Sequence, residues 1–242
     1  MTGLHRLGRL VVFGANTDVG KTVVSTGIVR AALKNVKFEK VVYCKPLQTG
    51  TIRGDSDVNF VKKFCSDDSV QNLVSKELFS WPKPLSPHVA AVNDPNKPTD
   101  DQVCESIDLF LSKENACVSF VETAGGVLSP GVQGTPQADT YRSYLPEVIL
   151  VGDGRLGGIS TTLCALQALQ SREYNIRSIV MIEDDSSLGN SEYIASYCKT
   201  NQTGKGPTVH VASLPGLPHI SEPLYQWYND TEIMFQKILD SL

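Results

Sequence analysis

The sequence predicts an α/β fold in which a doubly wound, mostly parallel sheet carries helices on both faces. Short, continuous apolar runs alternate along the chain with segments in which apolar residues recur at helical spacing. Continuous runs of this kind are typical of strands that are buried on both faces, as in parallel sheets. The length of 242 residues fits one large domain, so we expect residues 1–242 to form a single domain.

The individual elements follow from these runs in chain order. The first run, 10–13, ends at Gly14 and precedes apolar residues at helical spacing, which predicts a strand, a loop and a helix. We expect further strands at 41–44, 118–121, 148–151, 179–182 and 209–214. We expect helices at 56–65, 99–113, 160–171, 191–200 and 221–242. The proline-rich stretch 81–98 predicts a loop above the sheet.

Composition excludes several classes of protein. The chain has 22 Lys and Arg against 26 Asp and Glu, a net charge of −4, which argues against a basic nucleic-acid-binding scaffold. No apolar run approaches the roughly 18–20 residues of a membrane span, so we expect no membrane partner. The six cysteines are scattered, without metal-ligand spacing, which predicts neither a zinc site nor a disulfide framework. A reducing compartment is expected.

The strongest motif lies between the first strand and the first helix. Residues 14–22 read Gly-Ala-Asn-Thr-Asp-Val-Gly-Lys-Thr, which predicts a phosphate-binding loop of the P-loop NTPase type. Backbone N–H groups and the helix dipole bind polyphosphate, Lys21 adds a positive charge, and the Thr22 hydroxyl can ligate Mg²⁺. Ala15 departs from the usual pattern, which has glycine there. Asp18 is either a solvated loop residue or the partner of a metal or a substrate amine.

Charged residues at the ends of two further strands extend this motif. Lys45 follows the second strand and is either a second ammonium near the phosphates or a surface lysine at a strand end. Glu122 directly follows the run 118–121, which is the position of a Walker-B carboxylate that holds Mg²⁺. Asp57 begins a helix, and on the residues alone a helix-capping role is favoured over a second metal carboxylate.

A second glycine-rich segment, 152–160, follows a buried run and begins a helix. It is either an anion-binding helix start that could hold a substrate carboxylate, or a turn that needs glycine for tight strand-to-helix geometry. The residues leave both interpretations open.

Taken together, the motifs resemble the dethiobiotin synthetase family over nearly the whole chain. The loop form G-T-D-T-[ED]-V-G-K-T is matched at 14–22 except at Ala15 and Asn16, and K-P-x-x-[ST]-G is matched at 45–50. Ser-Asp is matched at 56–57, a Ser-Pro-x-His-like segment at 86–88, and V-E-[GT]-A-G-G at 121–126. Thr123 and the segment 152–158 look like the eukaryotic branch, which is often fused to a diaminopelargonate aminotransferase in the mitochondrion.

The resemblance implies an ATP- and Mg²⁺-dependent cyclo-ligase of biotin biosynthesis. In this family 7,8-diaminononanoate takes up CO₂ (or bicarbonate) as a carbamate, which attacks the γ-phosphate of ATP. The resulting carbamic-phosphoric anhydride closes to dethiobiotin, with release of ADP and phosphate. The catalytic residues implied are Thr17, Asp18, Lys21 and Lys45, and the metal ligands are Thr22, Asp57 and Glu122.

The resemblance also implies the binding residues and the partners. The nucleotide contacts are Asn16, Asp18, Val19, Gly20, Lys21, Thr22, Val23 and Glu183, the last in a Glu183-Asp184-Asp185 sequence where the family commonly has Asn-Asp to read adenine. The substrate contacts are Thr17, Lys45, Thr49, Gly125, Gly157, Gly158, Ile159, Ser160 and Tyr193. The family is a homodimer with the substrate carboxylate held across the interface. We expect the mitochondrial matrix for a eukaryotic source, and the cytoplasm otherwise.

Two other functions share a related loop and fold. A cobyrinate-diamide-type amide synthase carries an added glutamine-hydrolysing domain, for which we expect no room in 242 residues. A ParA-like ATPase switch uses a lysine early in the loop, where this chain has Ala15 and Asn16, and it carries basic surface. Phosphate release that depends on the diamine and bicarbonate distinguishes the synthetase from the switch.

Overall fold

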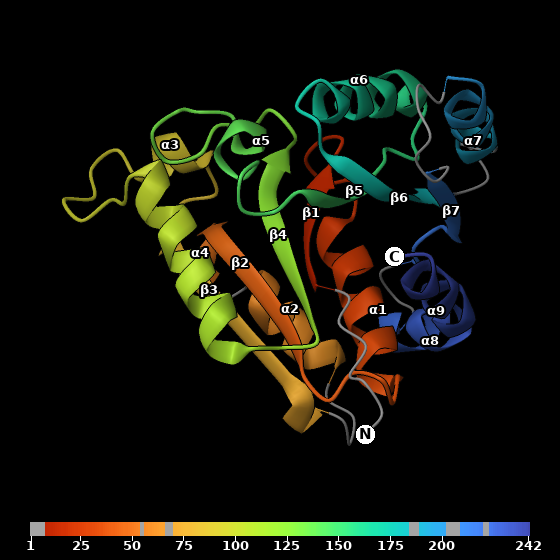
Figure 1. Ribbon diagram of the computed structural model, residues 1–242, viewed down its shortest axis with the longest axis horizontal. Helices are drawn as coiled ribbons and strands as arrows, with labels where there is room; N and C mark the ends of the chain where they lie inside the picture. Colours follow the sequence, from red (N-terminus) through yellow and green to blue (C-terminus); the bar gives the residue numbers. More distant parts are fainter. Residues whose placement is uncertain (1–7, 54–55, 66–69, 184–188, 202–208, 220–222) are drawn as a thin grey trace.

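The computed structural model describes residues 8–53, 56–65, 70–183, 189–201, 209–219 and 223–242 (Figure 1). Their strands form one sheet of seven strands in the order β3-β2-β4-β1-β5-β6-β7, and every pairing between them is parallel. The strands are β1 (Gly8–Gly14), β2 (Val41–Thr49), β3 (Leu73–Trp81), β4 (Val118–Gly126), β5 (Glu147–Val151), β6 (Asn175–Glu183) and β7 (His210–Pro215). The predicted parallel α/β class is confirmed.

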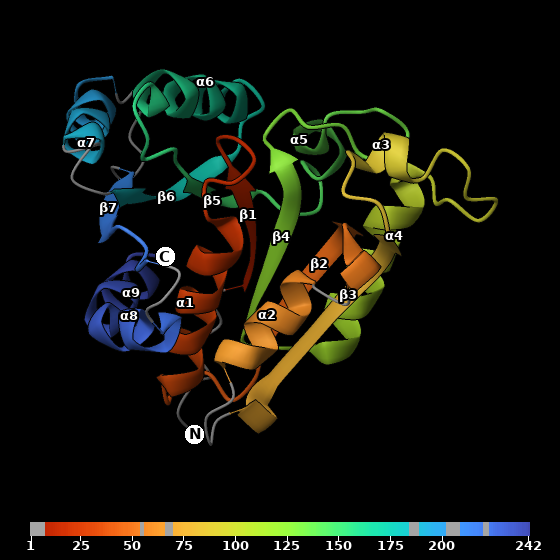
Figure 2. The ribbon, with the colours of Figure 1, turned by 180° about the vertical axis from the view of Figure 1, so that it is seen from behind.

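Helices cover both faces of this sheet, and each face has its own apolar core. Figure 2 shows α1 and α2 in front of the sheet, with α8 and α9 beside α1, whereas Figure 1 shows α4 on the opposite face. The helices on the first face are α1 (Lys21–Lys34), α2 (Asp57–Phe64), α8 (Leu224–Asp230) and α9 (Glu232–Asp240). The others are α3 (Pro87–Ala90), α4 (Asp100–Glu114), α5 (Gln137–Thr140), α6 (Gly158–Gln170) and α7 (Asn190–Thr200), with short 3₁₀ turns at Thr51–Arg53 and Val70–Asn72.

The strand β2 continues past the point where the sequence predicts its end. The strand was expected to span 41–44, but it extends to Thr49. The ladder between β2 and β4 has its last pair at Cys44 and Val121, so Pro46, which lacks an N–H group, removes no bond from that ladder. Lys45 therefore lies inside a buried strand at the point where β2 and β4 separate, rather than at the surface.

The structure differs from the sequence prediction in three further places. The strand β3 was missed because it is an edge strand whose pattern, with Ser75, Lys76 and Glu77, contains no continuous apolar run. The segment 221–242 was expected as one helix, but two helices meet at Thr231, whose hydroxyl donates to the Trp227 carbonyl at 2.6 Å. No proline or glycine between 224 and 240 signals that break. The loop expected at 81–98 contains the short helix α3.

The order of the strands in the sheet indicates where a ligand would bind. The strand β1 lies between β4 and β5, so the chain reverses its winding direction beside β1. In open parallel sheets ligands bind at such a switch point, outside the carboxyl ends of the strands. The loop from β1 to α1 and the ends of β2 and β4 all lie there (Figures 1 and 2). No helix in the described ranges has the length and apolarity needed to cross a membrane.

Candidate active site

The loop between β1 and α1 has the backbone geometry of a phosphate-binding loop. Gly20 has φ +88°, and a Cβ there would lie 2.7 Å from Cδ1 of Ile182 at the end of β6. Gly14 is equally constrained, since a Cβ would lie 2.8 Å from the Asn16 carbonyl oxygen. Asp18 also has a positive φ, of 56°, and its side chain is exposed. The loop therefore depends on glycine at 14 and 20, whereas Ala15 is accommodated with its N–H donating to Val151 at 2.8 Å.

The N-terminus of α1 faces the same edge of the sheet. Its N-cap is Gly20, no side chain caps it, and its first turn contains no acidic residue. The first N–H groups of a helix have no partner within the helix and carry the positive end of its dipole, so they attract anions. Lys21 begins this helix, is only 8% exposed, and its ammonium donates to the Asn16 carbonyl at 3.3 Å. Burial and then the charge of Lys45 lower the pKa of Lys21.

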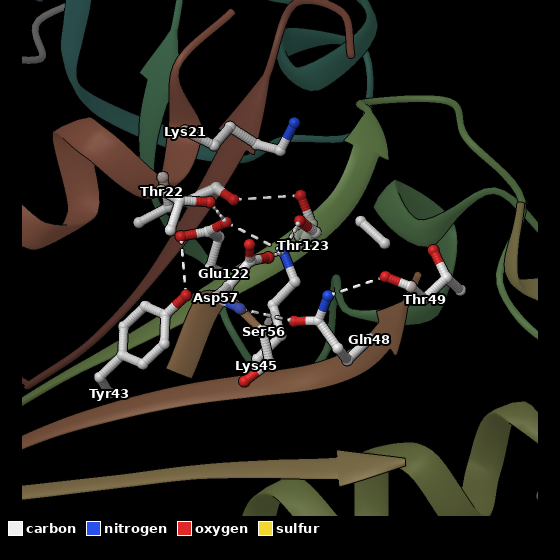
Figure 3. A network of polar contacts seen from close by, with 12 residues as sticks. Lys21, Thr22, Tyr43, Lys45, Gln48, Thr49, Ser56, Asp57, Glu122 and Thr123 are labelled. Carbon is white, nitrogen blue, oxygen red and sulfur yellow. Dashed lines mark hydrogen bonds and ion pairs between the residues drawn. The ribbon is translucent and has the colours of Figure 1, made fainter. Parts of the chain in front are cut away.

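Lys45 lies at the centre of a buried ionic cluster (Figure 3). Its ammonium is 2.5 Å from Oδ2 of Asp57 and 2.9 Å from Oε1 of Glu122, and it also donates to the Thr123 carbonyl at 3.0 Å. Burial by itself lowers the pKa of this lysine, but the charges of Glu122 and Asp57 outweigh it and the pKa is raised. Lys45 is therefore a fixed positive charge, held by two carboxylates.

Glu122 is fully buried and receives three hydrogen bonds from side chains. Its Oε1 accepts from the Thr22 hydroxyl at 2.8 Å and from Lys45, and its Oε2 accepts from the Tyr43 hydroxyl at 2.9 Å. Burial and then the charge of Glu122 raise the pKa of Tyr43, so this phenol stays protonated. The period of two along a strand explains the arrangement, since Tyr43 and Lys45 lie on the same face of β2.

Asp57 both begins α2 and joins this cluster. Ser56 is the N-cap, with its hydroxyl accepting from the Asn59 N–H at 3.2 Å, and Asp57 occupies the first helical turn. The backbone N–H of Asp57 donates to Oε1 of Gln48 at 3.1 Å, which ties the helix start to the end of β2. The carboxylate of Asp57 is thereby directed to Lys45. The cap of this helix is Ser56 and not Asp57, which instead places an acidic side chain in the first turn, and the role of Asp57 as a metal carboxylate stays a prediction.

These groups surround a cavity of about 380 Å³ at the switch point. Most of the residues that the sequence singled out line it, namely Thr17, Asp18, Gly20, Lys21, Thr22, Val23, Lys45, Thr49, Asp57, Glu122 and Gly125. Leu47, Gln48 and Ala124 complete the lining and were missed. Tyr43 lies behind Glu122 and was also missed. Gln48 belongs to the 45–50 motif, but nothing in the sequence points to Tyr43 except its spacing of two from Lys45.

The other predicted site residues lie outside this cavity. Asn16 lines a separate groove of about 440 Å³ between the phosphate loop and α6, and Val19 is buried within the loop. Glu183 ends β6, and its two oxygens accept from the Ser191 N–H at 2.9 Å and the Ser213 hydroxyl at 2.6 Å. Asp184 and Asp185 fall outside the described residues. The nucleotide roles of Asn16, Val19 and Glu183 stay predictions.

The segment that leads from β5 into α6 is rich in glycine because its backbone packs closely against other backbone atoms. A Cβ on Gly154 would lie 1.8 Å from the Ile182 carbonyl oxygen, and one on Gly158 would lie 1.8 Å from the Asp153 carbonyl oxygen. Close backbone contact therefore requires glycine at both positions. Ile159 and Ser160 follow in α6, which has no side-chain cap and no acid in its first turn. Neither this helix start nor Tyr193, on α7 and 53% exposed, lines the central cavity.

The oxygen atoms at the cavity fit a magnesium ion. Mg²⁺ prefers a few carboxylate or hydroxyl oxygens, with water and phosphate as its other ligands. Glu122 and Asp57 supply carboxylate oxygens that both contact the Lys45 ammonium, and the Thr22 hydroxyl lies 2.8 Å from Oε1 of Glu122. Within the described ranges, no group of three or more His, Cys, Asp or Glu is placed to hold a metal ion.

Fold and site together define a P-loop nucleotide-binding protein of the α/β class. A profile described as an AAA domain matches residues 8–223. A ParA family ATPase from Chlorobium tepidum superposes with a TM-score of 0.53 over 96% of this chain and 97% of that one, and at 14% identity this shows a shared fold alone.

Sequence relatives define the family further. A bifunctional dethiobiotin synthetase/7,8-diamino-pelargonic acid aminotransferase of rice, Oryza sativa subsp. japonica, is 34% identical over 96% of this chain and 33% of the relative. An ATP-dependent dethiobiotin synthetase of Lawsonia intracellularis is 31% identical over 87% of this chain and 95% of the relative. The chain belongs to the AAA domain family and to the dethiobiotin synthetase family. It spans about a third of the length of the bifunctional relatives.

Proposed function

We propose that this chain is an ATP- and Mg²⁺-dependent dethiobiotin synthetase, which carboxylates 7,8-diaminononanoate and closes the cyclic urea ring. The observation that carries the proposal is the convergence of Lys21, Lys45, Thr22, Asp57 and Glu122 on one cavity beside a phosphate-binding loop. The names and coverage of the relatives point to the same reaction.

The protein contributes position and charge to this reaction. The N-terminus of α1 and Lys21 hold the triphosphate, and Lys45 stabilises the negative charge that develops as a carbamate oxygen attacks the γ-phosphate. Thr17, Thr49 and Gly125 also line the cavity, and we assign them to the substrate. Asp18 lies at the rim, where its carboxylate orients a substrate amine. The second amine then attacks the anhydride, which closes the ring and releases phosphate.

The proposed metal ligands are Thr22, Asp57 and Glu122. Bound Mg²⁺ would neutralise charge on the phosphate oxygens. Since the Lys45 ammonium lies against the same two carboxylates, it would be the neighbour of both the metal and the transferred phosphoryl group.

The remaining substrate and nucleotide contacts belong to the periphery of the site. We propose a homodimer in which Gly157, Gly158, Ile159 and Ser160 at the start of α6, with Tyr193, bind the substrate carboxylate from the second copy. Their position outside the central cavity is consistent with this arrangement. Glu183 and Asn16 would contact the nucleotide. In a eukaryote the proposed location is the mitochondrial matrix, with a fused or associated diaminopelargonate aminotransferase as partner.

The test is product formation by the purified chain. Dethiobiotin, ADP and phosphate are measured with ATP, Mg²⁺, 7,8-diaminononanoate and bicarbonate, and again with each component left out. The proposal requires that dethiobiotin forms and that phosphate release depends on both the diamine and bicarbonate. Phosphate release that ignores both would identify an ATPase switch instead. Lys237→Ala, an exposed lysine on α9, is the matched control for lysine substitutions in the site.

A further inference from the structure

Tyr43 is a buried polar residue that the proposed reaction does not use directly. It has no exposed surface and belongs to the apolar core between the sheet and α1. Its hydroxyl lies 2.9 Å from Oε2 of Glu122, and it does not line the central cavity (Figure 3). The hydroxyl therefore contacts the carboxylate from outside the lining of the central cavity.

The two oxygens of Glu122 have different neighbours. Oε1 receives hydrogen bonds from Thr22 at 2.8 Å and Lys45 at 2.9 Å, both of which line the cavity. Oε2 receives the bond from Tyr43. An ionised carboxylate can only accept hydrogen bonds, so Tyr43 is the donor in this contact. The bond fixes the rotation of the carboxylate about its last side-chain bond and keeps Oε1 turned toward the cavity.

We propose that Tyr43 is a positioning residue for the metal site, holding Glu122 through Oε2 so that Oε1 is presented to Mg²⁺. This inference rests on the proposed function, because it takes Glu122 as a magnesium ligand. Hydrogen bonds behind a ligating carboxylate typically change metal affinity by about 10–100-fold when they are removed. Tyr43 therefore sets the Mg²⁺ affinity of the site without touching metal or substrate.

A purely structural tyrosine makes a different contact. Tyr174 is 5% exposed, and its hydroxyl donates to the Ala138 carbonyl at 2.9 Å, on the opposite face of the sheet and outside the central cavity. Tyr174→Phe removes a buried phenol hydroxyl that serves only packing and a backbone acceptor. It is thus the matched control for Tyr43→Phe.

The experiment measures Mg²⁺ affinity without turnover. The full chain is titrated calorimetrically with MgCl₂ in the presence of saturating β,γ-imido ATP, and with β,γ-imido ATP alone in EDTA. For Tyr43→Phe we expect Mg²⁺ affinity to fall about 10-fold while metal-free nucleotide affinity stays within twofold of wild type. Turnover of this variant should recover as MgCl₂ is raised. Tyr174→Phe should match wild type in all three measurements.

A double variant keeps the test decisive if Tyr43→Phe does not fold. Glu122→Gln removes the negative charge to which the Tyr43 hydroxyl donates its hydrogen bond, so Tyr43→Phe should fold in that background. The double variant should differ from Glu122→Gln alone by less than twofold in Mg²⁺ affinity. An unfolded double variant, or wild-type Mg²⁺ affinity in Tyr43→Phe, overturns the inference. If the nucleotide affinity of the wild-type chain does not depend on Mg²⁺, the proposed function is overturned instead. Failure of the Tyr43 inference and failure of the proposed function are therefore distinguishable.

Discussion

Replacing Lys45 by alanine removes the ammonium group that lies between Glu122 and Asp57. In the folded chain this leaves a fully buried glutamate and a nearby aspartate with no positive charge in contact. Breaking a buried ion pair by removing one partner typically costs about 3–5 kcal/mol, because the remaining charge is not solvated. The free energy of unfolding at neutral pH should therefore fall by about that amount.

The same substitution should strongly reduce activity. If Lys45 stabilises the transferred phosphoryl group, losing one such electrostatic contact lowers turnover by roughly 10²–10³-fold. Added MgCl₂ should stabilise the variant more than wild type, since a divalent cation can replace the missing charge between the two carboxylates. Because the pKa of Lys45 is raised, its contribution to stability is present up to the ordinary lysine value and lost only as the pH rises through the folded value.

Urea unfolding with and without MgCl₂ measures the predicted loss of stability in Lys45→Ala, and the rate of dethiobiotin formation measures the predicted loss of activity. Lys237→Ala should leave unfolding and turnover unchanged. Near-normal turnover in Lys45→Ala would refute the role of this lysine in phosphoryl transfer. A variant as stable as wild type at neutral pH would refute the electrostatic reasoning, because the Glu122 carboxylate would then tolerate full burial without the Lys45 counter-ion.

Further predictions concern the glycine turn and a histidine of β7. Gly158→Ala should lower the free energy of unfolding by about 3 kcal/mol, because its Cβ meets the Asp153 carbonyl oxygen at 1.8 Å. Gly157→Ala, with φ +87° but open space, should cost only about 1–2 kcal/mol, and the reverse order in urea unfolding would contradict this account. Burial lowers the pKa of His210, so the unfolded chain binds the proton more readily and stability should fall as the pH drops below the ordinary histidine value. His210→Asn should be less sensitive over that range, and identical pH profiles in thermal unfolding would disprove the assignment.

The sequence motifs predicted the centre of the site well. Lys21 and Thr22 are adjacent in the chain, and Lys45 and Glu122 each occur at or just after a buried run. Since the carboxyl ends of parallel strands lie at one edge, these residues must meet once the strands are parallel and β1 lies beside β4. The spacing could not tell whether Lys45 faces solvent, and the structure shows it 4% exposed.

Elements without a strong local signal were not predictable in this way. The strand β3 is polar along much of its length because it is the edge strand, and only its pairing with β2 makes it a strand. The break at Thr231 has no proline or glycine to announce it, and it lets α9 pack against α1 where Gly27 leaves room for the ring of Phe235. Both depend on contacts between distant segments.

The sequence by itself determined the fold class, the phosphate loop and the identity of the charged groups. The fold class follows from the local periodicity of apolar residues, and the loop and the charged groups follow from motifs of neighbouring residues. Only the tertiary structure decided that the Tyr43 hydroxyl binds Oε2 of Glu122 and that the Lys45 ammonium lies between two carboxylates. The physical reason is that strand register and the separation of β2 from β4 fix which side chains share a buried space. Because water is excluded from that space, each hydrogen bond there is stronger than in water and each unpaired charge costs more free energy.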